Sequence, residues 1–204
     1  MLINIHTHNR TGIKNQLEIV AGEDTIGIHP WDLNKKADFS KARDYCLMIG
    51  ETGLDRCERY KQTILEQGKI LYLHFEAANK FNLPIVLHCV RAHSDLLKIL
   101  KDLKYNGKIL LHDFAGNAQQ LNSYLDYDVY FSFRRKFEIL KLAPLDRIFL
   151  ETDDQTQFSI QDIYQQAGVA EMQFEINFLN LFSDAKDVRS ADVVNYFSLA
   201  LNSH

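Results

Sequence analysis

Short apolar runs alternate with stretches of helical periodicity along most of this sequence. Eight such runs stand out: Leu2–Ile5, Leu17–Ala21, Thr25–Ile28, Cys46–Ile49, Ile85–Leu87, Lys108–Leu111, Val129–Ser132 and Arg147–Leu150. Several are apolar throughout rather than at every second position, which is typical of strands buried on both faces of a parallel sheet. Because helical segments separate most of them, the pattern predicts an α/β fold and, with eight strands, a TIM (β/α)8 barrel.

The longest helix is predicted over Ile64–Phe81, and Asn82-Leu83-Pro84 is expected to end it. Further helices are predicted over Ser94–Leu103, Ala118–Leu125, Phe137–Leu142, Ile160–Ala167, Glu171–Phe182 and Ala191–Leu201. The second and third predicted strands are too close in sequence to hold a helix between them. We therefore expect a distorted barrel with shortened early connections, formed by residues 1–204 as a single domain.

The composition limits the class of protein. The chain of 204 residues is long enough for one sizeable core, and its 9 glycines and 3 prolines are too few for an all-β sandwich. Its net charge of −4 offers no basic field to hold nucleic acid, so any contact with DNA must be local. The three cysteines lack CxxC spacing and indicate reduced thiols in a cytoplasmic protein. We expect neither a signal peptide nor a membrane span, because no apolar run approaches about 18 residues.

Histidines and acidic residues gather where the predicted strands end. The set comprises the HxH pair His6 and His8, His29 in GIHPW, Glu51 in IGETGLD, His88 in PIVLHC, His112 in KILLHDFAG and Asp153 in RIFLETDD. Period-two spacing directs both imidazoles of the HxH pair to the same side of a strand. Because TIM barrels carry their active sites at the C-terminal ends of the strands, this set is the candidate site.

Each of these residues has an ordinary structural explanation when it is considered alone. A single buried histidine such as His88 is more often a hydrogen-bonded core residue, and Glu51 or Asp153 could be an acid at a helix start. Together, however, so many imidazoles and two carboxylates cannot share one pocket without a cation or extensive protonation. Four imidazoles and two carboxylates suffice for two divalent ions, with Glu51 placed to bridge them and Asp153 placed to accept a proton from the attacking water.

The motifs HxH, GIHPW, IGETGLD, PIVLHC, HDFAG and PLDRIFLETD occur in an order that resembles the TatD-related metal-dependent hydrolases of the amidohydrolase-like superfamily. The resemblance covers about residues 3–154. It implies a dinuclear metal site, deoxyribonuclease activity, and Asp153 and Glu51 as the catalytic carboxylates. The metal ligands that it implies are His6, His8, Glu51, His88, His112 and Asp153. The candidate cofactors are two divalent ions, which could be zinc, magnesium or manganese.

Some segments differ from the usual pattern of the family. The chain reads DQT after Asp153 where members usually have Ala or Ser followed by Pro-Tyr, and HDFAG where members usually have His-Cys-Phe-Ser-Gly. After PIVLHC it reads Val90-Arg91-Ala92, which shifts the arginine of the family by one position. Members are also commonly longer, so the chain resembles a short form. These differences fall at the substrate rim and leave all six ligand identities intact.

Four residues are candidates for substrate contact. Arg134, in the basic run that follows the seventh predicted strand, could hold a phosphodiester, and the alternative is a solvated helix start. Arg91 and His93, just beyond His88, are further candidates, and His29 is expected to form a pocket wall. Among the remaining residues, Trp31 could stack on a base but is expected to pack, Cys89 is expected in the core, and His74 and His204 are not ligand candidates.

The sequence therefore predicts a metal-dependent phosphoester hydrolase, of the 3′-acting deoxyribonuclease type, with DNA ends or a small phosphoester as its substrate. No membrane contact and no obligate protein partner are expected. The alternative enzyme is an amidohydrolase-like hydrolase of a small-molecule ester, lactone or amide. Histidinol-phosphatase-like barrels also begin with HxH, but they typically end with a late Asp-x-His, and no histidine lies between His112 and His204. A metal-binding or scaffold protein without activity is the non-enzyme alternative.

Overall fold

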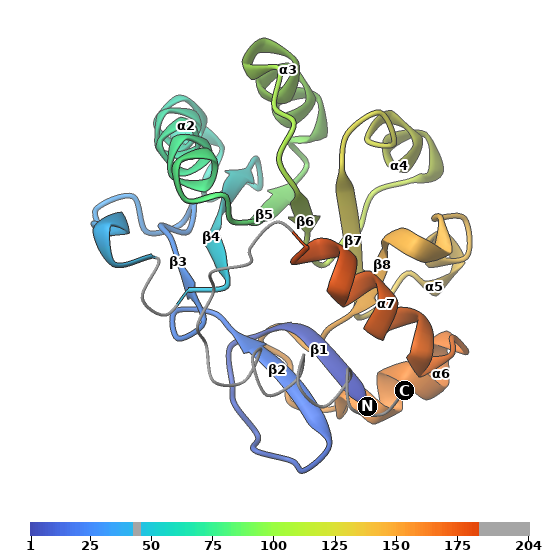
Figure 1. Ribbon diagram of the computed structural model, residues 1–204. Helices are drawn as coiled ribbons and strands as arrows, with labels where there is room; N and C mark the ends of the chain where they lie inside the picture. Colours follow the sequence, from blue (N-terminus) through green and yellow to red (C-terminus); the bar gives the residue numbers. More distant parts are fainter. Residues whose placement is uncertain (43–45, 184–204) are drawn as a thin grey trace.

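Eight parallel strands form a ring in the computed structural model, which describes residues 1–42 and 46–183 (Figure 1). The strands are β1 (Leu2–Thr7), β2 (Gln16–Val20), β3 (Thr25–Ile26), β4 (Met48–Asp55), β5 (Ile85–Val90), β6 (Ile109–Leu111), β7 (Val129–Phe133) and β8 (Ile148–Leu150). Strands β3 to β8 pair in sequence order as one parallel sheet, and β1 pairs with β2 in a second. The two sheets meet where the end of β1 lies beside the segment after β8, because Thr7 forms a parallel bridge with Asp153.

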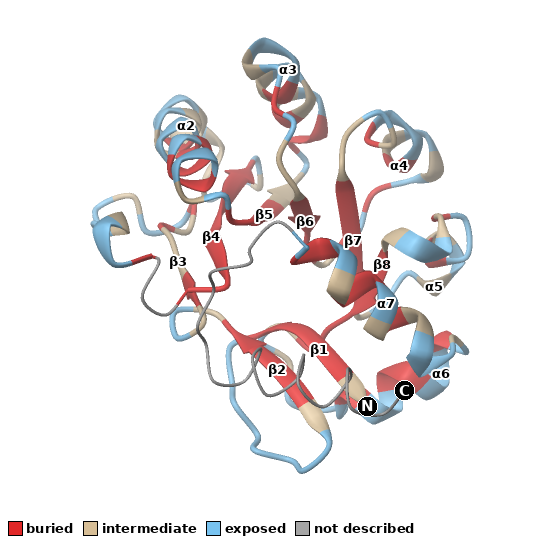
Figure 2. Cartoon of the chain, in the orientation of Figure 1, coloured by how far each residue is buried: buried red, intermediate tan, exposed pale blue. Residues whose placement is uncertain are grey.

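The described helices surround this ring, and the last of them lies across one end of it. They are α2 (Ile64–Phe81), α3 (His93–Leu103), α4 (Ala118–Ser123), α5 (Phe137–Leu140), α6 (Ile160–Ala167) and α7 (Glu171–Leu181), with 3₁₀ turns η1 (Phe39–Lys41), η2 (Lys61–Thr63) and η3 (Leu145–Arg147). Strand residues are mostly buried, and the outward helix faces are exposed (Figure 2). The described connections between β1 and β2 and between β2 and β3 contain no helix, so the predicted distorted barrel with shortened early connections is confirmed.

Helix α2 ends as the sequence predicts. Asn82 adopts the left-handed conformation with φ 53°, and its backbone N–H caps the carbonyls of Ala78 and Asn79. Pro84 then precedes β5. The predicted helix Ala191–Leu201 and His204 lie outside the described residues.

Strand β4 is longer than the sequence predicts. The expectation that Glu51 follows this strand is wrong, because β4 continues through the GETGLD motif to Asp55. Gly53 permits the extension, since a Cβ at this position would lie 1.9 Å from the carbonyl oxygen of His88 on β5. Gly27 similarly allows close approach of Gly50, whose Cα would lie 2.5 Å from a Cβ at position 27. These glycines therefore allow β3, β4 and β5 to lie close together where the site forms.

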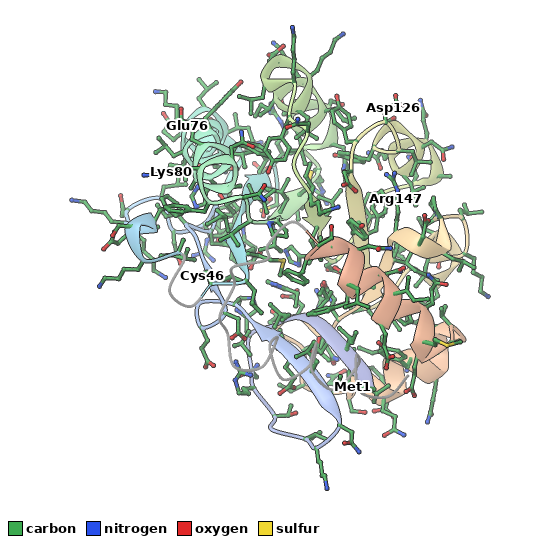
Figure 3. All side chains as sticks on the ribbon, viewed as in Figure 1. Met1, Cys46, Glu76, Lys80, Asp126 and Arg147 are labelled. Atoms are coloured by element: carbon green, nitrogen blue, oxygen red, sulfur yellow. The ribbon has the colours of Figure 1, made fainter. Side chains whose placement is uncertain are left out.

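Helix α7 covers the N-terminal end of the barrel, as Figure 1 shows. Its Asn177 Nδ2 donates to the carbonyls of Leu145 and Ile148 at 2.8 Å. Phe174 and Phe178 of the same helix are fully buried. Arg147, labelled in Figure 3, donates to the carbonyl of Tyr127 at 2.6 Å and joins η3 to the connection that leads into β7. The opposite end, where the strands finish, is where the candidate site lies. No described helix is both long enough and apolar enough to cross a lipid bilayer.

Candidate metal centre

The carboxylate of Glu51 lies at the centre of five histidines. Its Oε1 is 2.9 Å from His112 Nε2, 3.0 Å from His29 Nε2 and 3.2 Å from His88 Nδ1. Its Oε2 is 3.3 Å from His6 Nε2 and 3.5 Å from His8 Nε2. These side chains come from the ends of β1, β3, β4, β5 and β6, so the parallel strands bring together residues that are far apart in sequence.

Asp153 joins this cluster of candidate ligands from the segment after β8. Its Oδ1 lies 3.4 Å from His8 Nε2 and 3.8 Å from His6 Nε2. The backbone of Asp153 is fixed on both sides by β1, because its N–H donates to the His6 carbonyl at 3.1 Å and its carbonyl accepts from the His8 N–H at 3.0 Å. The HxH pair and Asp153 are therefore positioned by one shared stretch of backbone.

Four overlapping groups in this cluster have ligand atoms close enough to share an ion. They are His6, Glu51 and His112; His6, His8 and Asp153; His29, Glu51 and His88; and His112, Glu151 and Asp153. The Nε2 atoms of His6 and His112 are buried and face the Glu51 carboxylate at 3.3 and 2.9 Å. An imidazole nitrogen that is buried against a carboxylate oxygen needs a proton or a metal cation between the two atoms. The imidazole and carboxylate donors thus fit divalent metal ions.

The charges within the cluster also fit a cation. Burial opposes ionisation of Glu51, but the charge of His112 and hydrogen bonds from the surrounding imidazoles outweigh it and hold the pKa of Glu51 well below its usual range. Hydrogen bonds to Asp153 and Glu51 raise the pKa of His8 to about 10. Burial lowers the pKa of His112, but the charges of Glu51 and Glu151 raise it well above its usual value. Because protons and metal ions compete for the same nitrogens, metal binding here would release protons.

Two buried carboxylates behind the cluster were not identified from the sequence. Asp55 on β4 lies 3.4 Å from His88 Nε2, on the ring edge opposite Glu51. Glu151 places Oε1 3.3 Å from His112 Nδ1 and accepts from the Asp113 N–H at 2.9 Å and from the Ser132 hydroxyl. A carboxylate on the second ring nitrogen fixes the orientation of a metal-binding imidazole.

A sequence signal exists for both of these carboxylates. Asp55 lies four residues after Glu51, so the alternation of a strand places the two side chains on the same face. Glu151 lies two residues before Asp153, directly after the apolar run of β8. An acidic residue that continues a buried strand is therefore a candidate support for a site at its end.

A cavity of about 460 Å³ opens over the cluster. Its lining includes most of the predicted ligands and one predicted wall residue: His8, His29, Glu51, His88, His112 and Asp153. His6 is fully buried and lies beneath them. His29 comes closer to Glu51 than a pocket wall requires, since its Nε2 approaches Oε1 as closely as the predicted ligands do.

Arg134 is held by acidic residues, two of which line the cavity. Its Nη2 is 3.0 Å from Asp113 Oδ2 and 3.5 Å from Asp153 Oδ2, and its Nη1 is 3.1 Å from Asp154 Oδ1. The Asp113 carboxylate also pairs with Arg135 at 2.8 Å. Both acidic partners, Asp113 and Asp154, occur where the sequence departs from the family pattern.

Arg91 and His93 lie beside the site rather than in its lining. Arg91 is exposed just after β5 in the left-handed conformation with φ 53°. His93 begins α3, is buried, and places Nδ1 3.0 Å from the Tyr124 hydroxyl and 3.5 Å from Cys89 Sγ. The structure thus places His93 in a packed layer behind the strands, away from the predicted substrate.

Comparisons with known proteins agree with this geometry. A family model described as "TatD related DNase" matches residues 2–176. The chain belongs to the TatD-related family. Two solved TatD structures share the fold: a hydrolase TatD family protein from Entamoeba histolytica (TM-score 0.57, 20% identity, 90% of this chain and 76% of that one) and the TatD homolog YJJV from Escherichia coli K12 (TM-score 0.55, 19% identity, 94% and 76%).

Curated TatD-related proteins match at somewhat higher identity. The uncharacterized metal-dependent hydrolase YcfH of Escherichia coli K12 is 28% identical over 162 residues, which cover 70% of this chain and 60% of that protein. The 3'-5' ssDNA/RNA exonuclease TatD of Cronobacter turicensis is 34% identical over 148 residues, which cover 63% and 56%. The chain therefore spans about 60% of the length of the curated relatives that it matches. Together with the candidate ligand cluster, these relatives support the use of divalent metal ions.

Proposed function

We propose that this TatD-related protein is a divalent-metal-dependent hydrolase of phosphoester bonds, a deoxyribonuclease of the 3′-exonuclease type that uses two ions. The observation that carries the proposal is the position of Glu51, whose two carboxylate oxygens face different histidines from several strands. A carboxylate shared in this way suits a bridge between two ions. The relative named as a 3'-5' ssDNA/RNA exonuclease supports the choice of substrate.

The proposed ligands are the six residues of the family pattern: His6, His8, Glu51, His88, His112 and Asp153. When bound, divalent ions such as zinc, magnesium or manganese stabilise charge on a phosphoryl oxygen and lower the pKa of water. Glu51 bridges the two sides of the cluster. His29 approaches Glu51 from the cavity side and orients this carboxylate from there.

Asp153 accepts the proton from the attacking water. Burial opposes its ionisation, but the hydrogen bond from His8 and the charges of His112 and His6 hold its pKa below the usual range. The carboxylate is therefore in the form that accepts a proton, and it lines the cavity in which a phosphoester would lie. The backbone bonds to β1 keep it next to the HxH pair.

The rim favours strand ends or small phosphoesters over long duplex DNA. The chain has a net charge of −4, and the guanidinium of Arg134 is paired with acidic neighbours. Because the chain is acidic overall, binding by counterion release is weak. A cavity of about 460 Å³ accommodates a nucleotide at a strand end.

The test is hydrolysis by purified protein, stripped with a chelator and then loaded with zinc, magnesium or manganese. The substrates are a single-stranded oligonucleotide labelled at its 5′ end, a phosphomonoester and a lactone. We expect metal-dependent shortening of the oligonucleotide from its 3′ end, and its loss in Asp153→Ala and His88→Ala. Asp126→Ala is the matched control, because this exposed acid precedes β7 at the other end of the barrel (Figure 3).

Failure to hydrolyse any phosphoester after loading with each metal would overturn the proposal. Turnover of the lactone alone would favour the alternative, an amidohydrolase-like hydrolase of a small ester, lactone or amide. Unchanged metal-dependent turnover in Asp153→Ala would contradict the assigned proton acceptor.

A further inference from the structure

Trp31 lies at the boundary between the metal-centre cavity and a second hollow. It lines the cavity over Glu51, and it also lines a groove of about 570 Å³ between the loop after β3 and helix α2. Its side chain is 49% exposed. Among the described large hydrophobic side chains that are exposed, Trp31 is the one that lines either of these spaces.

The indole of Trp31 is fixed in place although it is half exposed. Its Nε1 donates to the buried carboxylate of Asp55 at 2.7 Å, and its ring stacks on Tyr60 with centroids 5.1 Å apart and planes at 11°. That separation for nearly parallel rings is an offset stack, so Tyr60 covers the indole only in part. The ring of His29 meets it edge to face with centroids 4.5 Å apart. An aromatic surface that is already immobilised loses little conformational entropy when a ligand packs on it.

The groove beyond Trp31 combines aromatic surface with groups that can pair with a polar ring edge. Its other lining residues are Pro30, Leu33, Asn34, Tyr60, Thr63, Glu66, Lys69 and Ile70. The amide, hydroxyl, carboxylate and ammonium groups among them offer both donors and acceptors. A planar heterocycle with polar edges matches this surface better than a purely apolar group does.

We propose that Trp31 and Tyr60 form a subsite for the nucleobase that flanks the scissile phosphoester, with the groove receiving the base edge. The assignment rests on the proposed phosphoester hydrolase function, because the groove adjoins the metal-centre cavity through Trp31 itself. A phosphoester over Glu51 places its neighbouring nucleoside beside this indole. Aromatic contact of this kind tolerates any base, since every base has a π face.

The chain contains one tryptophan, so its intrinsic fluorescence reports this subsite directly. The protein is titrated with a nuclease-resistant phosphorothioate tetranucleotide and with the same backbone carrying abasic sugars, and binding is followed independently by the anisotropy of a fluorescein label. We expect saturable quenching of Trp31 emission by the strand with bases, and affinity for the abasic strand about tenfold weaker. Equal affinity for the two strands, or binding of the base-containing strand without a change in emission, would overturn the subsite.

Steady-state kinetics give a second measurement. In Trp31→Ala we expect the ratio of KM for the abasic strand to KM for the strand with bases to fall from about ten to about one. The ratio is used because loss of Trp31 also removes the hydrogen bond that Asp55 accepts from the indole. The loss of that bond would affect both substrates equally. Tyr72→Ala, an exposed aromatic of α2 outside the groove lining, is the control and should retain the wild-type ratio. An unchanged ratio in Trp31→Ala refutes the subsite, whereas absence of any phosphoester hydrolysis in wild type refutes the proposed function instead.

Discussion

The two sides of the barrel mouth are built differently. The loop side consists of the connections between β1 and β4, which carry His8 and His29, and no helix separates β1 from β2 or β2 from β3. The helix side consists of the connections after β5 to β8, where helices follow the strands that carry or precede His88, His112 and Asp153. Both sides place imidazoles next to the Glu51 carboxylate at similar distances. The comparison shows that a helix is not required to position a strand-end residue when other contacts fix the backbone.

On the loop side, buried polar side chains fix the backbone through hydrogen bonds. The carboxylate of Glu18 on β2 accepts from the backbone N–H groups of Thr11 and Gly12 at 2.8 and 3.2 Å. His74 of α2 accepts from the Ile28 N–H at 2.8 Å, directly before His29. These bonds hold the backbone of the loop side in place where no helix lies between the strands.

On the helix side, the strand ladder and buried Glu151 fix the ligands. The ladder pairs β5 with β6, β6 with β7 and β7 with β8 in one continuous parallel sheet. Glu151 then joins His112, the Asp113 N–H and the Ser132 hydroxyl beneath the ligand layer. Support for His112 on this side therefore comes from the one buried carboxylate of Glu151.

The largest effect is expected from Glu151→Ala. Removing one member of a fully buried charged network leaves several groups unsatisfied, so the free energy of unfolding should fall by about 4 kcal/mol. Loss of the carboxylate behind His112 should also weaken metal affinity by about 10- to 100-fold. Chemical denaturation and metal titration measure the two effects. Glu151→Gln, which keeps the shape and an acceptor, should lose about half as much stability, and equal losses in the two variants would contradict the role of the hydrogen bonds.

A pH effect of about 3 kcal/mol is expected on the loop side from His74. Burial lowers its pKa from 6.5 to about 4 against the opposing hydrogen bond to the Ile70 carbonyl. Because the unfolded chain binds this proton more readily, the contribution to stability is complete above pH 6.5, declines as pH falls from 6.5 to 4, and is lost below pH 4. Unfolding measured from pH 4 to 7 in wild type and in His74→Gln, which cannot titrate, isolates this contribution. Parallel pH profiles for the two proteins would show that His74 is not the titrating group.

The meeting of the candidate ligands in one cluster could be predicted from the sequence because the barrel imposes it. Once eight parallel strands are recognised, the residues at their C-terminal ends must meet, and His6, His88 and Asp153 follow from that rule. The directions in which side chains point after the strands end could not be predicted in the same way. Arg91 and His93 are two residues apart, yet the start of α3 turns His93 into the packed layer beside Tyr124.

Contacts between residues that are far apart in sequence could not be predicted from local sequence patterns either. The sequence shows Arg134 as a free basic residue after a strand, whereas the structure surrounds it with acids from the segments after β6 and β8. The glycines of GETGLD suggest the end of a strand by composition, but close packing against β5 is the reason for their small size. In each case the deciding neighbour is distant in sequence.

A smaller effect, about 2 kcal/mol, is expected from Glu18→Ala. The carboxylate is buried and also accepts from the Thr11 hydroxyl and from Gln16 Nε2 at 2.8 and 2.7 Å, so its removal leaves the loop between β1 and β2 without its anchor. Hydrogen exchange of the Thr11 and Gly12 amides should accelerate in the variant while amides in β6 and β7 change little. Uniform acceleration throughout the barrel would mean that the loop is not an independent unit of the fold.

The smallest effect is expected from Trp31→Phe, which keeps an aromatic ring and removes the Nε1 donor to Asp55. Because Trp31 is half exposed, water can replace part of the lost hydrogen bond, and the free energy of unfolding should fall by only about 1 kcal/mol. Asp55 still accepts from the Cys57 N–H at 2.7 Å and still faces His88, so metal affinity should change far less than in Glu151→Ala. A metal titration compares the two variants directly. If Trp31→Phe weakened metal binding as much as Glu151→Ala, the Trp31 indole would support the candidate ligands as strongly as the Glu151 carboxylate does. The two sides of the mouth would then differ only in the length of their connections.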